Sequence, residues 1–123
     1  MDLRLELVII PVTDVDRAKA FYVDRFGFNA DHDQVVTPEL RFVQLTPPGS
    51  ACSIAFGLGL TDAEPGSVTG LQVVTSDIEA TQRDLRDRGV DVGEIDDQAW
   101  GRFLHVVDRD GNRWAIQQIV RPA

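Results

Sequence analysis

The sequence predicts an α+β fold of two paired βαβββ modules, and two internal repeats indicate it. Gly49 in PPGSACSIAFG matches Gly111 in DRDGNRWAIQQI at a spacing of 62 residues (111 − 49 = 62). Asp14 in VIIPVTDVDRA matches Asp77 in LQVVTSDIEA at a spacing of 63 (77 − 14 = 63). Units of about 60 residues are too small to close a core alone, so we expect the modules to pair and their sheets to face a common cleft.

The first module, residues 1–57, opens with the apolar run LELVIIPV, which is typical of a buried strand. Asp14 is a suitable N-cap for a helix whose apolar residues recur at helical spacing until Gly27. Strand-like segments follow at residues 28–34, 40–45 and 52–56. Residues 58–69, LGLTDAEPGSVT, form a linker rich in turn residues.

The second module, residues 70–123, repeats this order. Asp77 is the N-cap of a predicted helix over residues 78–88, which Gly89 ends. Further strands are predicted at residues 90–95, 102–107 and 113–119. In the last of them, alternation places Trp114 toward the helices, in the core. We expect one domain over residues 1–123.

Composition and charge limit the function. No apolar run approaches the roughly 20 residues that cross a bilayer, and charged residues interrupt the N-terminal segment, so we expect a soluble cytoplasmic protein. The single Cys52 cannot form an internal disulfide, and we interpret it as a small apolar side chain. The net charge of −8 disfavours nucleic acid and anionic membranes as partners.

The paired modules, the segment IPVTDVDRAKAFY, and WGRF followed by DRDGN and a final strand resemble the glyoxalase, bleomycin-resistance protein and extradiol dioxygenase superfamily. The resemblance covers essentially the whole chain. It implies a concave cleft and, in metal-dependent members, a divalent ion at the positions of Leu7, Ser53, Gly70 and Ala115. Three of these have no donor side chain, and a lone serine is a poor ligand, so we expect no metal and no cofactor.

Strand alternation and the resemblance together predict which side chains line the cleft. If Ala115 points into it, so does Gln117, and Phe103 and His105 on the neighbouring strand should also face inward. An apolar wall with a few polar groups suits a small, partly aromatic molecule. The predicted ligand-binding residues are Leu7, Ile9, Phe42, Gln44, Ser53, Gln72, Trp100, Phe103, His105 and Gln117.

Several of these residues allow two interpretations. His105 is either a histidine satisfied by its neighbours or a ligand-binding or acid-base residue, and Trp100 either stacks on a flat ligand or plugs the end of the sheet. No carboxylate partner for a histidine is identifiable. We expect His32 to lie in an exposed loop, and the acidic runs 31–33 and 94–97 to be solvated loops. Arginines 41, 102 and 113 are either anion clamps or solvated strand ends.

Three functions follow. The first is a metal-free, homodimeric binding protein of the bleomycin-resistance type. The second is a metal-independent isomerase or lyase with His105 as catalytic acid-base and Gln44 or Gln117 orienting the substrate. The third, a metal-dependent lyase or dioxygenase, needs ligands at other positions. Twofold pairing would bury module edges that a monomer exposes.

Overall fold

The computed structural model describes residues 1–119, along which the βαβββ order occurs twice. The first module contains β1 (Leu7–Ile9), α1 (Val15–Ala20), its π-helical extension η1 (Phe21–Arg25), β2 (Asn29–Thr37), β3 (Leu40–Thr46) and β4 (Ser53–Leu58). The second contains β5 (Leu71–Val74), α2 (Ile78–Asp87), β6 (Asp96–Gln98), β7 (Gly101–Val107) and β8 (Arg113–Ile119). The predicted α+β class with two modules is confirmed.

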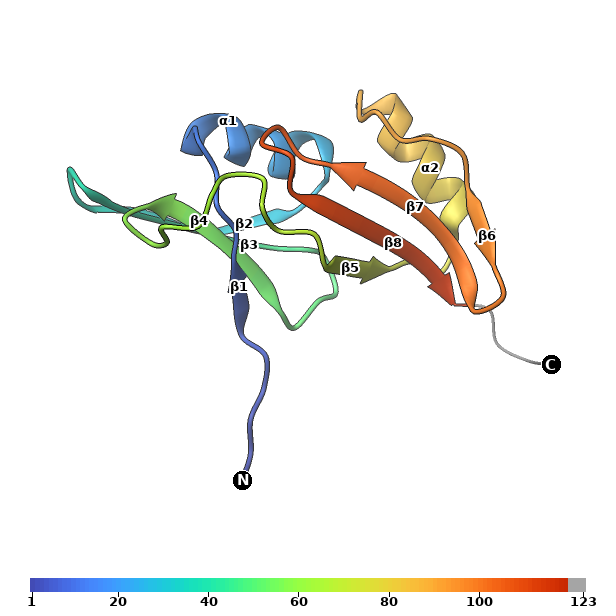
Figure 1. Ribbon diagram of the computed structural model, residues 1–123, viewed down its shortest axis with the longest axis horizontal. Helices are drawn as coiled ribbons and strands as arrows, with labels where there is room; N and C mark the ends of the chain where they lie inside the picture. The colour runs from blue at the N-terminus through green and yellow to red at the C-terminus, as the bar shows by residue number, and fades with distance from the viewer. Residues whose placement is uncertain (120–123) are drawn as a thin grey trace.

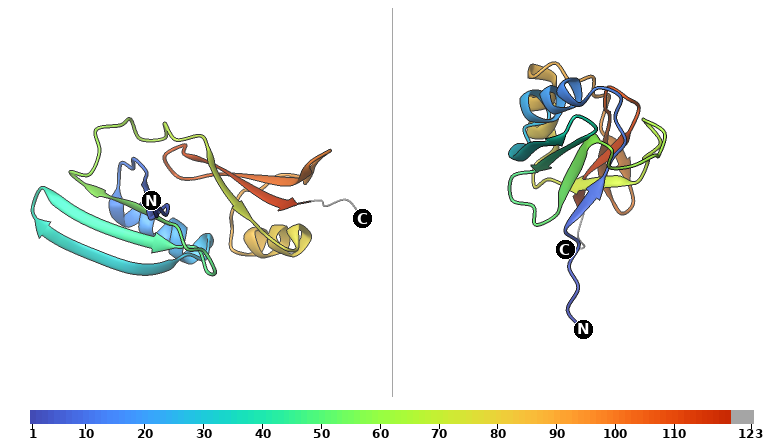
Figure 2. Two further views of the ribbon diagram at one scale, coloured as in Figure 1. Left: turned by 90° about the horizontal axis from the view of Figure 1, so that it is seen from below. Right: turned by 90° about the vertical axis from the view of Figure 1, so that its left-hand side faces the viewer.

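Each module forms a four-stranded sheet, ordered β1-β4-β3-β2 in the first and β5-β8-β7-β6 in the second. In both sheets the first strand is parallel to the last, and the other neighbours are antiparallel. Figure 1 shows the first sheet on the left and the second on the right. Both helices lie on one side of the molecule in Figures 1 and 2, so each sheet keeps one face without a helix, which we call its open face.

The repeated residues have the same structural roles in both modules. The Asp14 side chain accepts a hydrogen bond from the backbone N–H of Arg17 at 3.0 Å, and Asp77 accepts one from Ala80 at 3.0 Å. Each carboxylate therefore caps the first turn of its helix. Gly111, in the turn before β8, has a φ of 103°, a left-handed conformation that disfavours residues with a Cβ.

One predicted strand is absent. Residues 90–95 do not form a strand, and β6 begins only at Asp96. Val90 and Val92 are buried in the core, which explains their strand-like alternation. The backbone carbonyl groups of Val92 and Gly93 accept hydrogen bonds from the Arg86 side chain of α2, at 3.3 and 3.2 Å, rather than from a neighbouring strand.

The segments expected to be solvated loops belong in part to strands. Residues 31–33, with His32, lie in β2, and Asp96 and Asp97 lie in β6. All of β2 is exposed, as expected for His32, but His32 is in register with Gln44 of β3. The strand-like segment predicted at residues 28–34 overlaps β2, whereas β6 was not predicted. Polar and charged residues are common on edge strands, where they discourage further pairing, and this composition concealed β6.

The two modules share one hydrophobic core. The covered face of the first sheet contributes buried side chains such as Val43 and Phe56, and that of the second contributes Leu104 and Ile116. Trp114 is 4% exposed and contacts the aromatic side chains after α1, as alternation predicts. No helix within residues 1–119 has the length and apolar character that crossing a membrane requires.

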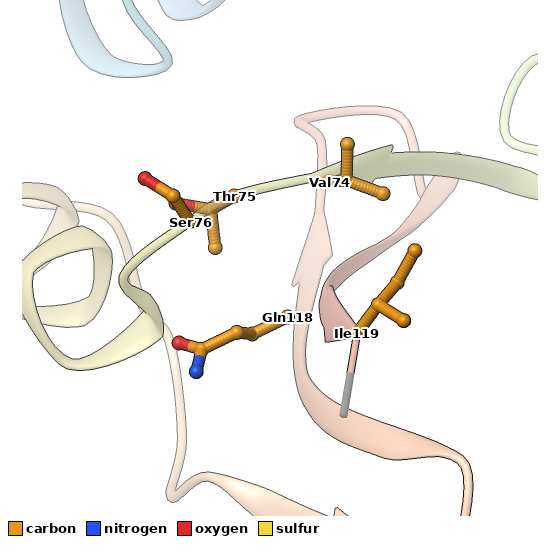
Figure 3. Close-up of a pocket in the computed structure, with 5 residues that line it drawn as sticks. All are labelled: Val74, Thr75, Ser76, Gln118 and Ile119. Atoms are coloured by element: carbon orange, nitrogen blue, oxygen red, sulfur yellow. The ribbon is translucent and has the colours of Figure 1, made fainter. Parts of the chain in front are cut away.

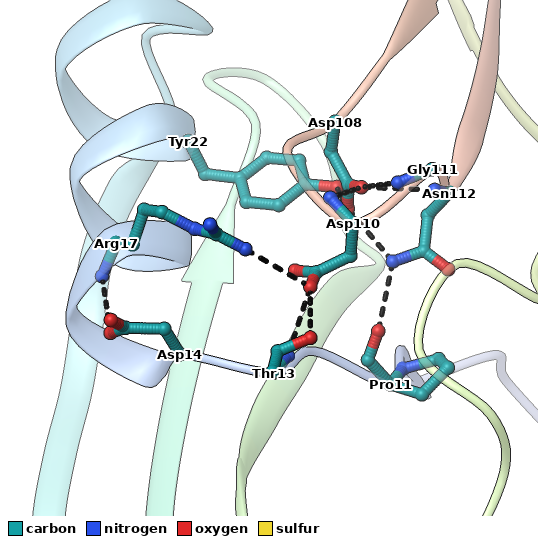
Figure 4. Close-up of polar contacts among 9 residues, drawn as sticks. All are labelled: Pro11, Thr13, Asp14, Arg17, Tyr22, Asp108, Asp110, Gly111 and Asn112. Atoms are coloured by element: carbon teal, nitrogen blue, oxygen red, sulfur yellow. Dashed lines mark hydrogen bonds and ion pairs between the residues drawn. The ribbon is translucent and has the colours of Figure 1, made fainter.

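A buried polar network joins the modules where the turn between β7 and β8 meets the first module (Figure 4). The Tyr22 hydroxyl donates to Asp108 at 2.7 Å and accepts from the Trp114 indole at 2.9 Å. Asn112, with no exposed surface, donates to the backbone oxygen of Pro11 at 2.9 Å and to Asp108 at 2.8 Å. These bonds fix the two sheets relative to each other through side chains far apart in the sequence.

Candidate functional site

The strand register determines which side chains share an open face. In the first sheet Leu7 pairs with Ser53, and alternation puts these residues on the face opposite the core residues Ile54 and Val43. Ile9, Phe42 and Gln44 follow the same alternation. All five residues predicted to line the cleft from the first module therefore lie on its open face.

The second sheet repeats this arrangement. Ala115 of β8 pairs with Gln72 of β5 and with His105 of β7. Phe103 pairs with Gln117, so all of these residues share the open face of the second sheet. The structure thus brings together the residues predicted from the second module, with Trp100 in the turn that precedes β7.

A hollow of about 350 Å³ lies on the open face of the second sheet. The rings of Phe103 and His105 are parallel within 9°, with centroids 6.5 Å apart, so one planar molecule can lie parallel to both. The Trp100 side chain is 64% exposed, which argues against a role as a plug for the end of the sheet. The hollow is lined by Asp96, Gln98, Trp100, Phe103, His105 and Ala115.

His105 has a carboxylate neighbour that the sequence did not reveal. Its Nε2 atom lies 3.7 Å from Oδ2 of Asp96, and both side chains are partly exposed to solvent. The register places Asp96 of β6 opposite Phe103, beside the same hollow. This neighbour was not identifiable from the sequence, because Asp96 falls in a segment assigned to a solvated loop.

Each open face also carries a row of hydrogen-bonded polar side chains. On the first sheet, Nε2 of Gln44 donates to the Ser53 hydroxyl at 3.3 Å, and Ser53 and Thr46 share a hydrogen bond of 2.6 Å. The Thr46 hydroxyl in turn donates to Asp31. Thr46 and Asp31 were not among the predicted residues, although Thr46 lies two positions after Gln44, at the spacing that shares its face.

On the second sheet, Nε2 of Gln72 donates to Oε1 of Gln117 at 2.6 Å. Nε2 of Gln117 donates to the backbone oxygen of Trp100 at 3.1 Å. A further hollow of about 290 Å³ lies where the sheets meet, and both Ser53 and Gln72 line it. The two polar rows therefore approach a common space.

A hollow of about 400 Å³ lies elsewhere, at the end of β5 and β8 (Figure 3). Its lining is aliphatic, hydroxyl and amide, without an aromatic or ionisable side chain: Val74, Thr75, Ser76, Gln118 and Ile119. The side-chain oxygen of Gln118, Oε1, already accepts a hydrogen bond from the backbone N–H of Ile78, at 2.7 Å, at the start of α2. The lining of this hollow therefore suits a small organic ligand less well than the lining of the hollow beside His105.

The register alters one of the metal positions implied by the resemblance. Leu7 and Ser53 are paired, as the mapping requires, but Ala115 is paired with Gln72, and Gly70 precedes β5. The position beside Ala115 therefore belongs to Gln72. The repeat spacing did not show this difference in register.

The side chains at these positions do not fit a divalent transition ion, which imidazole, thiolate and carboxylate groups bind. The Ser53 hydroxyl is engaged with Thr46 and Gln44, and the Gln72 amide is engaged with Gln117. Leucine and alanine supply no donor atom. Across residues 1–119, no three His, Cys, Asp or Glu side chains gather in a way that could hold a metal ion.

Two of the three candidate arginines are engaged in ion pairs. Arg41 contacts Asp33 and Asp16, each at 2.9 Å, and Arg102 contacts Asp97 at 2.8 Å. Hydrogen bonds from Arg41 and then Lys19 hold the pKa of Asp33 below its ordinary value. These pairs connect each helix or edge strand to its own sheet and leave neither arginine positioned as an anion clamp on an open face.

The chain is similar to several known proteins along nearly its full length. TnmS3, an antibiotic binding protein from Streptomyces sp. CB03234, is 33% identical, with a TM-score of 0.87 over 97% of this chain and 98% of its own. A glyoxalase/bleomycin resistance protein from the same strain is 34% identical, with a TM-score of 0.82 over 94% of this chain and all of its own (100%).

A curated bacterial relative covers a similar range. The uncharacterized protein YetH of Bacillus subtilis (strain 168) is 24% identical over 113 residues, which are 90% of this chain and 94% of YetH. The sequence pattern described as Glyoxalase/Bleomycin resistance protein/Dioxygenase superfamily matches residues 4–116. The duplicated βαβββ fold and this match lead to one conclusion: the chain belongs to the glyoxalase/bleomycin resistance protein/dioxygenase superfamily.

Proposed function

We propose that the protein binds a small, planar, partly aromatic organic molecule on its open faces, without a metal ion or other cofactor. The observation that carries the proposal is the hollow of about 350 Å³ in which Trp100, Phe103 and His105 meet. Aromatic side chains beside a few polar groups are the usual composition of small-molecule sites. The ligand would lie parallel to the rings of Phe103 and His105.

The similarity to TnmS3 supports binding as the function. TnmS3 is an antibiotic binding protein and is 33% identical to this chain over nearly the full length of both. Antibiotic-like aromatic compounds are therefore the first ligands to examine. The net charge of −8 disfavours polyanionic ligands, nucleic acid and anionic membranes. The lone Cys52, without a disulfide partner, is consistent with a cytoplasmic location.

We also propose that the site is completed in a homodimer. The open faces leave large apolar side chains in solvent, among them Ile9 at 40%, Val74 at 66% and Ile119 at 43% exposure. A second copy would cover these side chains and bring another open face over the hollow. Leu7, Ile9, Phe42, Gln44 and Ser53 would then belong to the same site as the residues of the second sheet.

A second function, metal-independent catalysis, is favoured by one observation. Asp96 lies 3.7 Å from Nε2 of His105, where it can orient the imidazole. A histidine held in this way can move a proton to or from a bound molecule through its other nitrogen. Gln117, paired with Phe103 on the same face, is placed to orient a substrate.

The test is a thermal-shift screen of planar aromatic compounds, including antibiotics, with the metal-free protein. A bound ligand should raise the melting temperature, and Trp100→Ala and His105→Ala should each reduce that shift. Val35→Ala is a matched control, because Val35 is an exposed apolar residue of β2 that pairs with Arg41, on the face of the first sheet opposite the open face.

The outcomes separate the two functions. Reduced affinity in both variants, with no change in the compound itself, supports a binding protein. Turnover that disappears in His105→Ala while binding persists supports the metal-independent enzyme. A ligand whose affinity neither substitution changes would show that the site lies elsewhere.

A further inference from the structure

We infer that the open faces recognise their ligand mainly through hydrogen bonds that the ligand donates. The inference rests on the proposed function and concerns the polarity of the same site. There are two separate rows of hydrogen-bonded polar side chains, one on each sheet. Each row begins at a group that can only accept a hydrogen bond, and this group determines which partner donates in every bond of the row. Both rows end in a glutamine side-chain carbonyl oxygen that accepts no hydrogen bond from residues 1–119.

On the first sheet the fixed group is Asp31. An ionised carboxylate has no proton to give, so the Thr46 hydroxyl must donate to it. Thr46 has only one hydroxyl proton, so Ser53 must donate in the 2.6 Å bond between them. Ser53 is then an acceptor for Gln44, which turns Nε2 toward it at 3.3 Å. The carbonyl oxygen of Gln44 is left without a partner in this row.

On the second sheet the fixed group is a backbone carbonyl. The oxygen of Trp100 can only accept, so Gln117 must turn Nε2 toward it, at 3.1 Å. Oε1 of Gln117 then accepts from Nε2 of Gln72 at 2.6 Å. The carbonyl oxygen of Gln72 is the unused end of this row, just as that of Gln44 is on the first sheet.

The hollow on the second sheet, where Ala115 lies between Gln72 and His105, adds acceptors of the same kind. Asp96 accepts from Gln98 at 2.8 Å and still has lone pairs to offer. Gln44, Gln72, Gln98 and Gln117 each retain one side-chain N–H, and Trp100 has its indole N–H, yet the lone pairs that these side chains and Asp96 offer outnumber the protons. The site therefore favours a ligand with hydroxyl, amino or ammonium groups.

The test compares three probes that share one flat ring system: 1-naphthol, 1-methoxynaphthalene and 1-naphthylmethylamine, which is cationic at neutral pH. Isothermal titration with the full-length protein should give the naphthol and the amine about 10-fold lower Kd values than the methoxy compound, which cannot donate. The methoxy compound serves as the reference because its ring has the same shape and its oxygen can only accept.

Asp31→Asn tests the fixed proton direction, because an asparagine amide can donate as well as accept. Thr46 is then free to reverse its hydroxyl, and we expect the preference for naphthol over the methoxy compound to fall to about 3-fold. Asp33→Asn is the matched control: it removes the same charge from the same strand, but Asp33 pairs with Lys19 and Arg41 rather than with the open face. It should leave the preference unchanged.

Equal or tighter binding of the methoxy compound by the wild-type protein would overturn this inference while leaving the proposed function in place. An equal fall in preference in both asparagine variants would also overturn it, since the effect would then come from charge alone. Failure of all three probes to bind would contradict the proposed function itself and the inference with it.

Discussion

Tyr22 shows how one side chain can secure the arrangement on which the site depends. Its hydroxyl is the meeting point of the Asp108 carboxylate and the Trp114 indole, and the side chain has no exposed surface. Burial, together with the nearby Asp108 carboxylate, raises the pKa of the Tyr22 phenol. The proton therefore stays on the phenol and continues to serve the hydrogen bond to Asp108.

This pKa predicts a loss of stability at high pH. An unfolded tyrosine releases its proton near pH ~10, whereas native Tyr22 keeps it to higher pH. Above pH ~10 the unfolded state then binds fewer protons than the native state, so the free energy of unfolding falls as pH rises. Tyr22→Phe should be about 1–3 kcal/mol less stable at pH 7. Its free energy of unfolding should, however, fall less steeply than that of the wild type as the pH rises above ~10.

Tyr22 is the only tyrosine in the chain, so ultraviolet spectroscopy reads its ionisation directly. At pH values where the tyrosine of the guanidinium-unfolded protein is already ionised, the native protein should contain no tyrosinate. Urea unfolding at a series of pH values gives the stability of both forms. Ionisation of native Tyr22 at the same pH as in the unfolded chain would contradict this account.

The roles of residues could be predicted in strands with a clear alternation of apolar and polar side chains. They could not be predicted where the role depends on how an edge strand pairs with its neighbour. Trp114 was assigned to the core and His105 to an open face because both lie in strands with clear alternation. Asp31 and Asp96 were missed because β2 and β6 are exposed edge strands of polar composition. The contacts of Asp96 with His105, and of Asp31 with Thr46, depend on register, which a single sequence does not specify.

At the scale of elements, the turn between β7 and β8 joins the modules through buried hydrogen bonds, in addition to the core that they share. Oδ1 of Asp108 accepts from the backbone N–H groups of Asp110, Gly111 and Asn112, each at 2.9 Å, which closes the turn. Asn112 then reaches the end of β1 through Pro11 and the linker through the N–H of Val68, at 3.2 Å. The turn therefore connects segments of both modules, and it also contains Gly111, one of the residues that reveal the internal repeat.

Asn112→Ala should destabilise the protein by about 3 kcal/mol or more, because buried groups of several segments lose their hydrogen-bond partner at once. Urea unfolding followed by tryptophan fluorescence measures the change. Asn29→Ala, an exposed asparagine in β2, is the matched control and should change stability by less than about 0.5 kcal/mol. Similar stabilities for the two variants would show that the turn does not hold the modules together.

The repeat predicted the element order because caps and turn glycines depend on local chemistry. Asp14, Asp77 and Gly111 have the roles that their residue types indicate. The segment at residues 90–95 was different, since buried valines suggested a strand while the backbone carbonyls had partners on α2. Burial and strand pairing give the same apolar alternation, and only the backbone hydrogen bonds separate them.

At the scale of the whole molecule, the helices cover one side and leave both open faces in solvent (Figure 1). Exposed apolar side chains on these faces include Ile9, Val74, Trp100 and Ile119. Large apolar side chains exposed on an open face are typical of an interaction surface. They are the physical reason to expect a second copy of the chain.

Light scattering at micromolar concentration should therefore give about twice the 13.6 kDa mass of one chain. Ile9→Asp places a charge among the apolar side chains of the first open face and should shift the protein toward the monomer. Val35→Asp is the control, because Val35 is exposed and pairs with Arg41 on the other face of the first sheet, and it should leave the mass unchanged. A wild-type protein that remains at the mass of a single chain would contradict the dimer.

The central claim is that a planar ligand binds beside Trp100 without a metal ion. Isothermal titration of a ligand from the thermal-shift screen, with and without excess chelator, tests it most directly when wild type and Trp100→Ala are compared. The account predicts the same Kd in both solutions for the wild type, and at least a 10-fold higher Kd for Trp100→Ala, from the loss of aromatic contact. Binding that disappears with chelator, or that Trp100→Ala leaves unchanged, would contradict it.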